Sequence, residues 1–303
     1  MYDLISIGGI SIDLYFKGDS LTFKDDRFQL AIGGKYLAEH FYVGIGGGGA
    51  NVAIGGAKNG LKTVVMGKIG NNVFKKIIVS KLVENEVSYS LCDFEDNYYN
   101  VSSILLSPEG ERSIIHYVTP HQHLFNDSNE LKGITKTKMA YLGNLPDVSL
   151  TDRTKLLHFF KKKKIKTVVN LGVSDCRRAL RELTKFLEPI DILIMNGHEF
   201  AEMVKAPYND IHFKEHVVKW YIPSLVNKIV VVTDGQKGSF AYVGDTIYHQ
   251  PAEKVSKIID ATGAGDGFTA GFIAEYIKSE SIEKSILNGS QSAAKILTKI
   301  GAN

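Results

Sequence analysis

The sequence predicts an α/β protein in which a mainly parallel sheet is accompanied by a smaller β layer. Apolar strand-like segments alternate with helical segments through the second half of the 303 residues, which is typical of a parallel sheet covered by helices on both faces. Two extended, aromatic-rich segments, near 11–44 and 98–119, interrupt this alternation. We therefore expect one α/β domain over 1–303, in which these two segments form a small β lid above the strand ends.

The first elements follow from their local patterns. A short buried strand is expected at 4–7, where an apolar run ends at two glycines. A glycine-rich turn at 44–49 leads into a helix that begins near Ala50. The apolar segment 63–66 is expected to be a strand, and the spacing of apolar residues over 74–85 predicts an amphipathic helix.

The later elements repeat the same alternation. Two strands at 101–106 and 113–118 flank turn residues at 108–110, which predicts a hairpin. The strands expected after it share an apolar, β-branched composition and lie at 139–143, 167–171, 190–195 and 228–233. Two helices over 267–279 and 282–299 complete the chain.

The composition argues against several classes of function. Hydrophobic residues make up 44% of the chain, charged residues 23%, and the net charge is only +3, so we expect no nucleic-acid partner. Cys92 and Cys176 lack metal-ligand spacing and form no disulfide framework, which favours a reducing, cytoplasmic setting. The N-terminal residues do not have the pattern of a signal peptide, and no segment is apolar for long enough to predict a membrane span.

The segment 260–271 is the most informative part of the sequence. Gly263, Ala264 and Gly265 are small residues directly before an apolar helix, so their backbone N–H groups can approach an anion such as phosphate. Asp266 lies at the same helix start, where the positive helix end is expected to favour its ionised form. A carboxylate there can accept a proton while those N–H groups stabilise a transferring phosphoryl group. A bare Gly-x-Gly-Asp more often marks only a helix cap, so the longer string decides the interpretation.

That string, Asp260-Ala-Thr-Gly-Ala-Gly-Asp-Gly-Phe-Thr-Ala-Gly271, closely resembles the C-terminal signature of the ribokinase-like (PfkB) carbohydrate kinase family. The resemblance implies a three-layer ribokinase-like fold and transfer of phosphate from MgATP to a sugar-like alcohol. It also implies that Asp266 is the catalytic base and that the backbone of Gly263, Ala264 and Gly265 forms an anion hole.

Other motifs of that family occur in the same order along the chain. Asp13, in Gly8-Gly-Ile-Ser-Ile-Asp13, matches an early substrate-binding aspartate. Gly46, Gly47 and Asn51 lie in Gly46-Gly-Gly-Gly-Ala-Asn51, which is similar to the family's substrate loop. Asn144 falls where many members place a polar residue that contacts the sugar. The resemblance thus assigns these five residues to the acceptor.

A third set of matches concerns the nucleotide. Asn196-Gly-His-Glu199 and Thr233-Asp-Gly-Gln-Lys-Gly238 resemble the family's motifs for Mg²⁺ with phosphate and for the nucleotide loop. Each follows a predicted strand, and ligands of open α/β sheets bind at the carboxyl ends of strands. The resemblance implies that ATP is bound by Asn170, Asn196, Glu199, Thr233, Gly235 and Gly238. Mg²⁺ is expected at Glu199, mainly through water.

The sequence also departs from the family pattern. Gly48 stands where ribokinases often carry lysine, and the segment 67–75 has Asn72 and Lys75 where the family has an acid and a glycine. Many relatives continue beyond the counterpart of Asn303 into a loop that completes a monovalent-cation site. Asp260 and Thr262 remain candidate ligands for K⁺.

Several alternatives remain at this point. A nucleoside kinase of the same family would satisfy the same motifs. The turn 44–49 spells a dinucleotide-binding fingerprint, but no acidic residue occurs between His40 and Val83, as a Rossmann oxidoreductase would require. No P-loop is present, and a binding protein without activity should lack Asp266 or the small residues before it.

Three histidines, His116, His121 and His123, are more often lid or surface residues than a zinc site at this spacing. Unpaired lid edges favour a homodimer formed through the lid.

Overall fold

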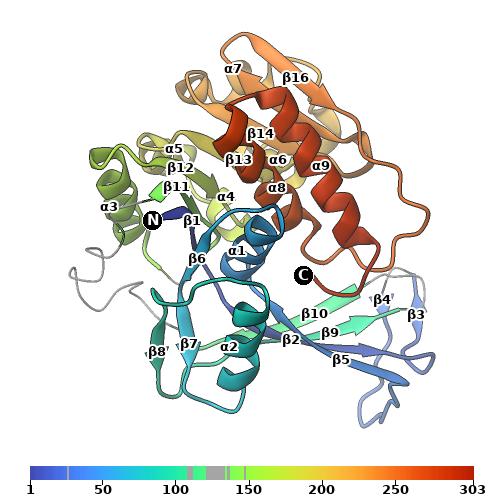
Figure 1. The fold of residues 1–303 in the computed structure, drawn as a ribbon. Coiled ribbons are helices and arrows are strands. Elements are labelled where there is room, and N and C mark those ends of the chain that lie inside the picture. The colour runs from blue at the N-terminus through green and yellow to red at the C-terminus, as the bar shows by residue number, and fades with distance from the viewer. Residues whose placement is uncertain (26, 108–111, 121–133, 135–136, 147) are drawn as a thin grey trace.

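The computed structural model describes residues 1–303 except 26, 108–111, 121–133, 135–136 and 147. An eight-stranded sheet forms the centre of the described part (Figure 1), in the order β16-β15-β14-β13-β12-β11-β1-β6. Along the chain these strands are β1 (Tyr2–Ile7), β6 (Thr63–Met66), β11 (Thr137–Leu142), β12 (Lys166–Asn170), β13 (Ile192–Asn196), β14 (Ile229–Thr233), β15 (Ser239–Val243) and β16 (Thr246–Gln250). All pairings from β14 to β6 are parallel, and only β15 and β16 join antiparallel. The predicted α/β class with a mainly parallel sheet is confirmed.

Helices cover both faces of this sheet. One face carries α3 (Leu150–Lys162), α4 (Val173–Cys176), α5 (Leu180–Leu187), α6 (Gly197–Val204) and α7 (Val217–Tyr221). The other face carries α1 (Gly48–Lys58), α8 (Ala264–Ser279) and α9 (Ile282–Leu297), and Figure 1 shows α8 and α9 side by side. Successive strand residues alternate between the two helical layers. In β11, for example, Tyr141 packs toward α8 and Leu142 toward the layer of α3 and α5.

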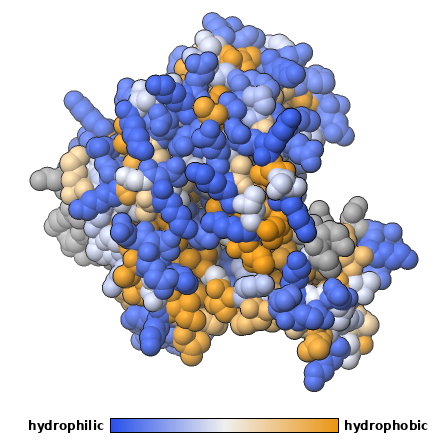
Figure 2. All heavy atoms as spheres, turned by 45° about the vertical axis from the view of Figure 1, so that its right-hand side comes forward, coloured by the Kyte–Doolittle hydropathy of each residue, from blue (hydrophilic) through white to orange (hydrophobic). Residues whose placement is uncertain are grey.

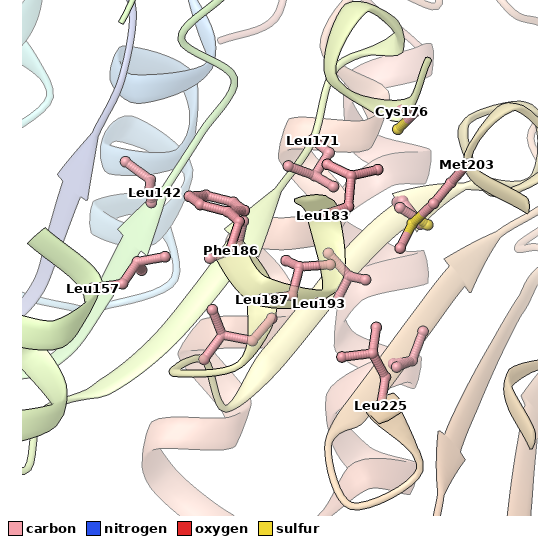
Figure 3. Close-up of a cluster of buried hydrophobic side chains, with 14 of the residues drawn as sticks. Leu142, Leu157, Leu171, Cys176, Leu183, Phe186, Leu187, Leu193, Met203 and Leu225 are labelled. Carbon is pink, nitrogen blue, oxygen red and sulfur yellow. The ribbon is translucent and has the colours of Figure 1, made fainter. Parts of the chain in front are cut away.

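The core on the α3 side shows why these segments are helical. Figure 3 shows Leu157 of α3, Phe186 of α5 and Met203 of α6 directed toward the strand residues Leu142 and Leu193. All five side chains are buried, and burying such a side chain stabilises the fold by about 1.5–3 kcal/mol. The apolar faces of these helices therefore hold them against the sheet.

A second, four-stranded sheet lies beside the central one. Its order is β10-β9-β2-β5, and its strands are β2 (Ser11–Lys17), β5 (His40–Gly46), β9 (Asn100–Leu106) and β10 (Arg112–Val118). We call these four strands the lid. Figure 1 shows them projecting below the helical layers, next to the short hairpin of β3 (Phe23–Lys24) and β4 (Arg27–Phe28). The presence of a small β sheet beside the main one is confirmed, whereas the turn expected at 108–110 lies outside the described residues.

Several shorter elements complete the description. Strands β7 (Lys68–Gly70) and β8 (Asp93–Glu95) pair in parallel, and α2 (Lys75–Glu84) packs near them. Single 3₁₀ turns are η2 (Tyr208–Asp210), η3 (Pro223–Leu225) and η4 (Gly235–Lys237). Helix α8 begins at Ala264 rather than at 267 as expected. Two small residues, Ala264 and Gly265, thus belong to its first turn. In the part of the chain that the structure describes, no helix combines the length and apolarity needed to cross a bilayer.

The strand order creates one position suited to a ligand. The chain leaves β1 toward β6 on one side, and the later strands from β11 to β14 add on the other side. Such a reversal opens a crevice at the carboxyl ends of the strands. The segments that follow β1, β11, β12, β13 and β14 all reach this edge of the sheet.

Candidate active site

A cleft of about 320 Å³ lies where the carboxyl ends of the central strands face the lid. Figure 2 shows the outline of the molecule indented between its main body and the lid. The lining comes from both layers and comprises Gly8, Gly9, Gly47, Gly48, Gly67, Lys68, Tyr98, Asn100, His116, Val118, Tyr141, Asn144, Leu145, Pro146, Asn170 and Asp266. Four residues predicted for the site, Gly47, Asn144, Asn170 and Asp266, are thus brought together around one space.

Gly263, Ala264 and Gly265 lie at the start of α8. We call these three residues the anion loop. Gly263 has φ of +76°, and a side chain there would overlap the methyl group of Ala302, so only glycine fits this position. The first N–H groups of a helix have no partner within the helix, although that of Ala264 lies 3.4 Å from the carbonyl oxygen of Ala261. The loop therefore has the geometry that favours an anion.

Asp266 lies in the first turn of α8, at the wall of the cleft. Asn51 Nδ2 donates a hydrogen bond to its Oδ2 at 2.8 Å. A side chain at Gly48 would place its Cβ 3.6 Å from Asp266 Oδ1, so Gly48 leaves room beside the carboxylate for a substrate. Burial raises the pKa of Asp266, the hydrogen bond from Asn51 lowers it, and the charge of Asp13 raises it. The net effect is a raised pKa. Burial therefore outweighs the effect of the positive helix end, which we expected to favour the ionised form.

Asp13 lies behind the cleft surface rather than on it. It is 5% exposed and accepts a hydrogen bond from Ser11 Oγ at 3.0 Å on Oδ1. Any side chain at Gly46 would overlap its carboxylate, which explains a glycine at that position. Burial raises the pKa of Asp13, while hydrogen bonds from Ser102 and Ser11 lower it.

The lid places a histidine opposite this aspartate. Across the sheet Asp13 pairs with Ser102, and Ser102 pairs with His116. Ser102 Oγ lies 3.2 Å from Nδ1 of His116, which lines the cleft. His116 is therefore a cleft residue on the lid, whereas His121 and His123 lie outside the described residues.

The predicted nucleotide residues lie along the ends of β12, β13 and β14. Asn196 caps α6, its Oδ1 accepts from Glu199 N at 2.8 Å, and Glu199 Oε2 accepts from Asn196 N at 2.9 Å. The pair therefore forms a capping box. Burial raises the pKa of Glu199 to about 7, the bond from Asn196 lowers it, and the charge of Asp266 raises it. Asn170, one strand away, donates from Nδ2 to the carbonyl oxygen of Ile194 at 2.9 Å.

The turn after β14 depends on glycine. Thr233 ends β14, and the turn returns directly into the antiparallel strand β15, so a hairpin is present. Gly235 and Gly238 have φ of +52° and +92°. A side chain at Gly238 would overlap the backbone of Gln250, whereas nothing lies within 4 Å of the Cβ position at Gly235. The motif therefore has a structural role in addition to any contact with nucleotide.

Asp260 and Thr262 form a compact buried turn. Asp260 is fully buried, and its Oδ1 accepts from the N and Oγ1 of Thr262 at 2.8 and 2.6 Å. Its Oδ2 accepts from Gly301 N at 3.0 Å. Oδ1 thus accepts two hydrogen bonds and Oδ2 accepts one, which leaves Oδ2 a further lone pair. A buried oxygen donor of the kind that suits a monovalent cation is therefore present.

Sequence reasoning missed two residues that line the cleft, Lys68 and Tyr141, and one behind it, Asn303. Lys68 is buried and pairs with Glu95, although it lies within the atypical segment 67–75. Tyr141 is buried beside Asp266, and burial raises its pKa well above the usual value. Asn303 donates from Nδ2 to Asn51 Oδ1 at 2.9 Å. No motif signals these residues; only the strand-end position of Tyr141 could have pointed to it.

The chain resembles known proteins over its full length. Residues 1–303 match the model of the pfkB family carbohydrate kinases. The chain is 28% identical to a probable chloroplastic fructokinase-6 of Arabidopsis thaliana over 245 residues, covering 76% of this chain and 62% of that protein. It therefore spans less than two thirds of that relative. It is 24% identical to a nucleoside kinase of Methanocaldococcus jannaschii over 318 positions, covering 99% and 92% of the two chains.

Solved structures show the same fold. A ribokinase of Arabidopsis thaliana complexed with ribose and ATP superposes with a TM-score of 0.80 at 21% identity, covering 99% of this chain and 94% of that chain. A ribokinase of Thermotoga maritima gives a TM-score of 0.80 at 19% identity, covering 100% and 95%. These likenesses establish a ribokinase-like fold. Because the family model spans the whole sequence, the chain belongs to the pfkB family of carbohydrate kinases.

Proposed function

We propose that the protein is an ATP-dependent kinase that transfers the γ-phosphate of MgATP to a hydroxyl group of a small sugar. The observation that carries this proposal is the position of Asp266. Its carboxylate lines the cleft, receives a hydrogen bond from Asn51 and lies next to the open space beside Gly48. A proton acceptor and an anion loop therefore meet at one helix start, as phosphoryl transfer requires. The chain acts as one kinase domain over 1–303, with a lid drawn from 11–44 and 98–119.

In the proposed reaction Asp266 acts as the general base. The acceptor hydroxyl loses its proton to Asp266 as its oxygen forms a bond to the γ-phosphorus, the bond to the bridging oxygen breaks, and ADP leaves. Backbone N–H groups of Gly263, Ala264 and Gly265 stabilise the charge on the transferring group. The raised pKa of Asp266 makes it a stronger base than an exposed aspartate.

MgATP is proposed to bind along the strand ends, with its γ-phosphate toward the anion loop. The nucleotide residues are Asn170, Asn196, Glu199, Thr233, Gly235 and Gly238. Mg²⁺ neutralises phosphate charge when bound, and the half-buried carboxylate of Glu199 suits it through bridging water. Asp260 and Thr262 are the proposed K⁺ ligands, since Asp260 places a buried carboxylate directly before the anion loop.

The proposed acceptor binds between the strand ends and the lid. Asp13, Gly46, Gly47, Asn51 and Asn144 are assigned to its hydroxyl groups. A nucleoside is the alternative acceptor, because the similarity to a nucleoside kinase covers 99% of this chain. We favour a free sugar, because the family model that matches the whole chain is that of carbohydrate kinases.

The decisive experiment is a panel assay of ADP release. Sugars, sugar acids and nucleosides are offered with MgATP to the wild type and to Asp266→Asn. Sugar-dependent ADP release that the variant loses would support the proposal. Release only with nucleosides would select the alternative acceptor, and no release with any acceptor would contradict the kinase function.

We further propose that the lid joins two copies of this chain. The lid face turned away from His116 carries Phe41, Val43, Ile115 and Tyr117, which are exposed. Phe16 extends this apolar face, with its ring centroid 5.2 Å from that of Phe41. Monomeric proteins rarely expose contiguous apolar surface of this kind, so a second lid is the expected cover.

A further inference from the structure

Asn303 is joined to Asp266 by a short chain of hydrogen bonds. Its Nδ2 donates to Asn51 Oδ1 at 2.9 Å, and Asn51 Nδ2 donates to Asp266 Oδ2 at 2.8 Å. The same Nδ2 of Asn303 also donates to the carbonyl oxygen of Ile45, in β5, at 2.9 Å. The chain of hydrogen bonds therefore connects the lid to the carboxylate through two side-chain amides.

The carbonyl oxygen of Ile45 determines which atom donates in each of these hydrogen bonds. A backbone carbonyl can only accept, so the end of the Asn303 amide that faces Ile45 must be the nitrogen. That nitrogen also faces Asn51, which must then present its oxygen. The nitrogen of Asn51 is thereby directed to Asp266. If Asn51 rotated by half a turn, its oxygen would face the carboxylate, and two acceptors in contact repel each other.

The orientation of Asn303 is maintained although it leaves a polar atom unsatisfied. Its own Oδ1 is buried and has no hydrogen-bond partner among the residues that the structure describes, which is unfavourable for a carbonyl oxygen. The preceding residues hold the segment in place: Gly301 N donates to Asp260 Oδ2 at 3.0 Å, and buried Ala302 packs against Gly263. Asn303 is thus fixed between the lid and the anion loop.

We propose that Asn303 is a positioning residue that locks the amide of Asn51, so that Asp266 always meets a hydrogen-bond donor. The proposal rests on the proposed function only in that Asp266 is taken as the base. None of the sequence motifs contains Asn303, and the residue does not line the cleft. Its effect on the reaction passes through Asn51 alone.

The first test is kinetic. Asn303→Leu removes both donated bonds at similar size, so Asn51 is free to rotate and Asp266 loses its donor part of the time. We expect kcat to fall on the order of tenfold, as for one hydrogen bond to a charged group, while the KM for ATP stays unchanged. Since the bond from Asn51 lowers the pKa of Asp266, the acid limb of the pH profile should move to higher pH.

Two controls separate positioning from a general loss of stability. Thr298→Val changes an exposed residue of the same segment whose Oγ1 donates to Lys295 O, and it should leave the rate and the pH profile unchanged. In a double-mutant cycle, Asn303→Leu should add nothing further to the loss caused by Asn51→Ala. Additive losses would mean that Asn303 acts by another route, and they would overturn the proposal.

A titration that needs no turnover completes the test. The carboxyl resonance of Asp266, identified by its absence in Asp266→Asn, is followed against pH by NMR in protein labelled at aspartate. A higher midpoint in Asn303→Leu supports the proposal even if no acceptor is ever found, and an unchanged midpoint overturns it even in an active kinase. If Asn303→Leu does not fold, Asn303→Ala is measured with the same two outcomes. Asp13, Glu199 and Tyr141 are the other titrating groups whose charge reaches Asp266, and they are unchanged in every variant.

Discussion

The carboxylate of Asp266 tests the proposed chemistry most directly. Asp266→Asn preserves the shape of the side chain but cannot accept the proton of the acceptor hydroxyl. We expect kcat to fall by about a hundred- to ten-thousand-fold, the usual cost of losing a positioned general base. The affinity for a non-hydrolysable ATP analogue should change little, because the carboxylate is proposed to contact the acceptor rather than the nucleotide. Asp245→Asn, at an exposed ion pair with Lys219, is the matched control, and turnover of folded Asp266→Asn within a few-fold of wild type would contradict the assignment.

Glu199 gives a prediction for stability against pH in the absence of nucleotide. Burial raises its pKa to about 7 in the folded protein, from the ordinary value of 4.5 for a glutamate. The folded state therefore binds this proton more tightly than the unfolded state. Its stabilising contribution is fully present below the unfolded pKa and is lost as pH rises through the folded pKa. The Tm of wild type should consequently fall, relative to that of Glu199→Gln, between about pH 5 and pH 8.

Glu202, one turn further along α6, supplies the matched control for that titration. Its hydrogen bond with Arg177 lowers its pKa, so Glu202 already carries its charge throughout this pH range. The Tm difference between wild type and Glu202→Gln should therefore stay constant with pH. If the Tm difference between wild type and Glu199→Gln is also independent of pH, the pKa of Glu199 is not raised toward 7.

At the scale of residues, the sequence predicts what a contiguous motif contains and misses what the fold brings together. The anion loop and Asp266 lie within a few positions of each other, so their joint chemistry is visible in the string. Asn51 and Asp266 lie 215 positions apart, and Asn303 and Asn51 lie 252 apart. Their hydrogen bonds depend on the packing of α1, α8 and the lid. The direction of the Asp266 pKa shift was missed for the same reason, since burial is a property of the folded chain.

At the scale of elements, the hairpin between β14 and β15 contains two glycines that differ in how strictly the backbone requires them. Gly238 has φ of +92° and ψ of −139°, a region that only glycine adopts readily. Gly238→Ala should therefore lower the free energy of unfolding by about 2–4 kcal/mol, from backbone strain and overlap with Gln250. Gly235→Ala is the matched control: its left-handed backbone should cost only about 1 kcal/mol, because its Cβ position is open. Urea denaturation measures both, and equal losses would contradict this distinction.

Element boundaries show the limits of local pattern. The apolar period predicts the body of α8, but small residues at Ala264 and Gly265 carry no period, so its first turn was expected to be loop. Strand ends before polar motifs were predicted more closely, since β13 ends at Asn196 and β14 at Thr233. Polar residues that follow a buried run mark a strand end more sharply than glycine marks a helix start.

At the scale of the whole molecule, alternation in sequence predicts the parallel sheet but not the order of its strands. The position of β1 between β11 and β6 arises from which helices pack on which face, and no local signal encodes it. The lid was predicted because its two segments lack the α/β alternation. The cross-strand register places Asp13 and His116 on the lid face toward the cleft, and the exposed apolar side chains Phe41, Val43, Ile115 and Tyr117 on the other face.

That apolar face leads to the prediction for assembly. Ile115 is 66% exposed and lies on the face turned away from the cleft, next to Tyr117. Ile115→Glu would place a charge in a contact between two lids, and burying an unpaired charge is strongly unfavourable. Sedimentation equilibrium should give the mass of two chains for wild type and of one chain for Ile115→Glu. Ile114→Glu is the matched control, because Ile114 is also exposed and adjacent on β10 but faces the cleft side, so this variant should remain a dimer. A wild type that sediments as a single chain at micromolar concentration would overturn the prediction. Dissociation by Ile114→Glu to the same extent as by Ile115→Glu would show that the edge of β10, rather than its apolar face, makes the contact.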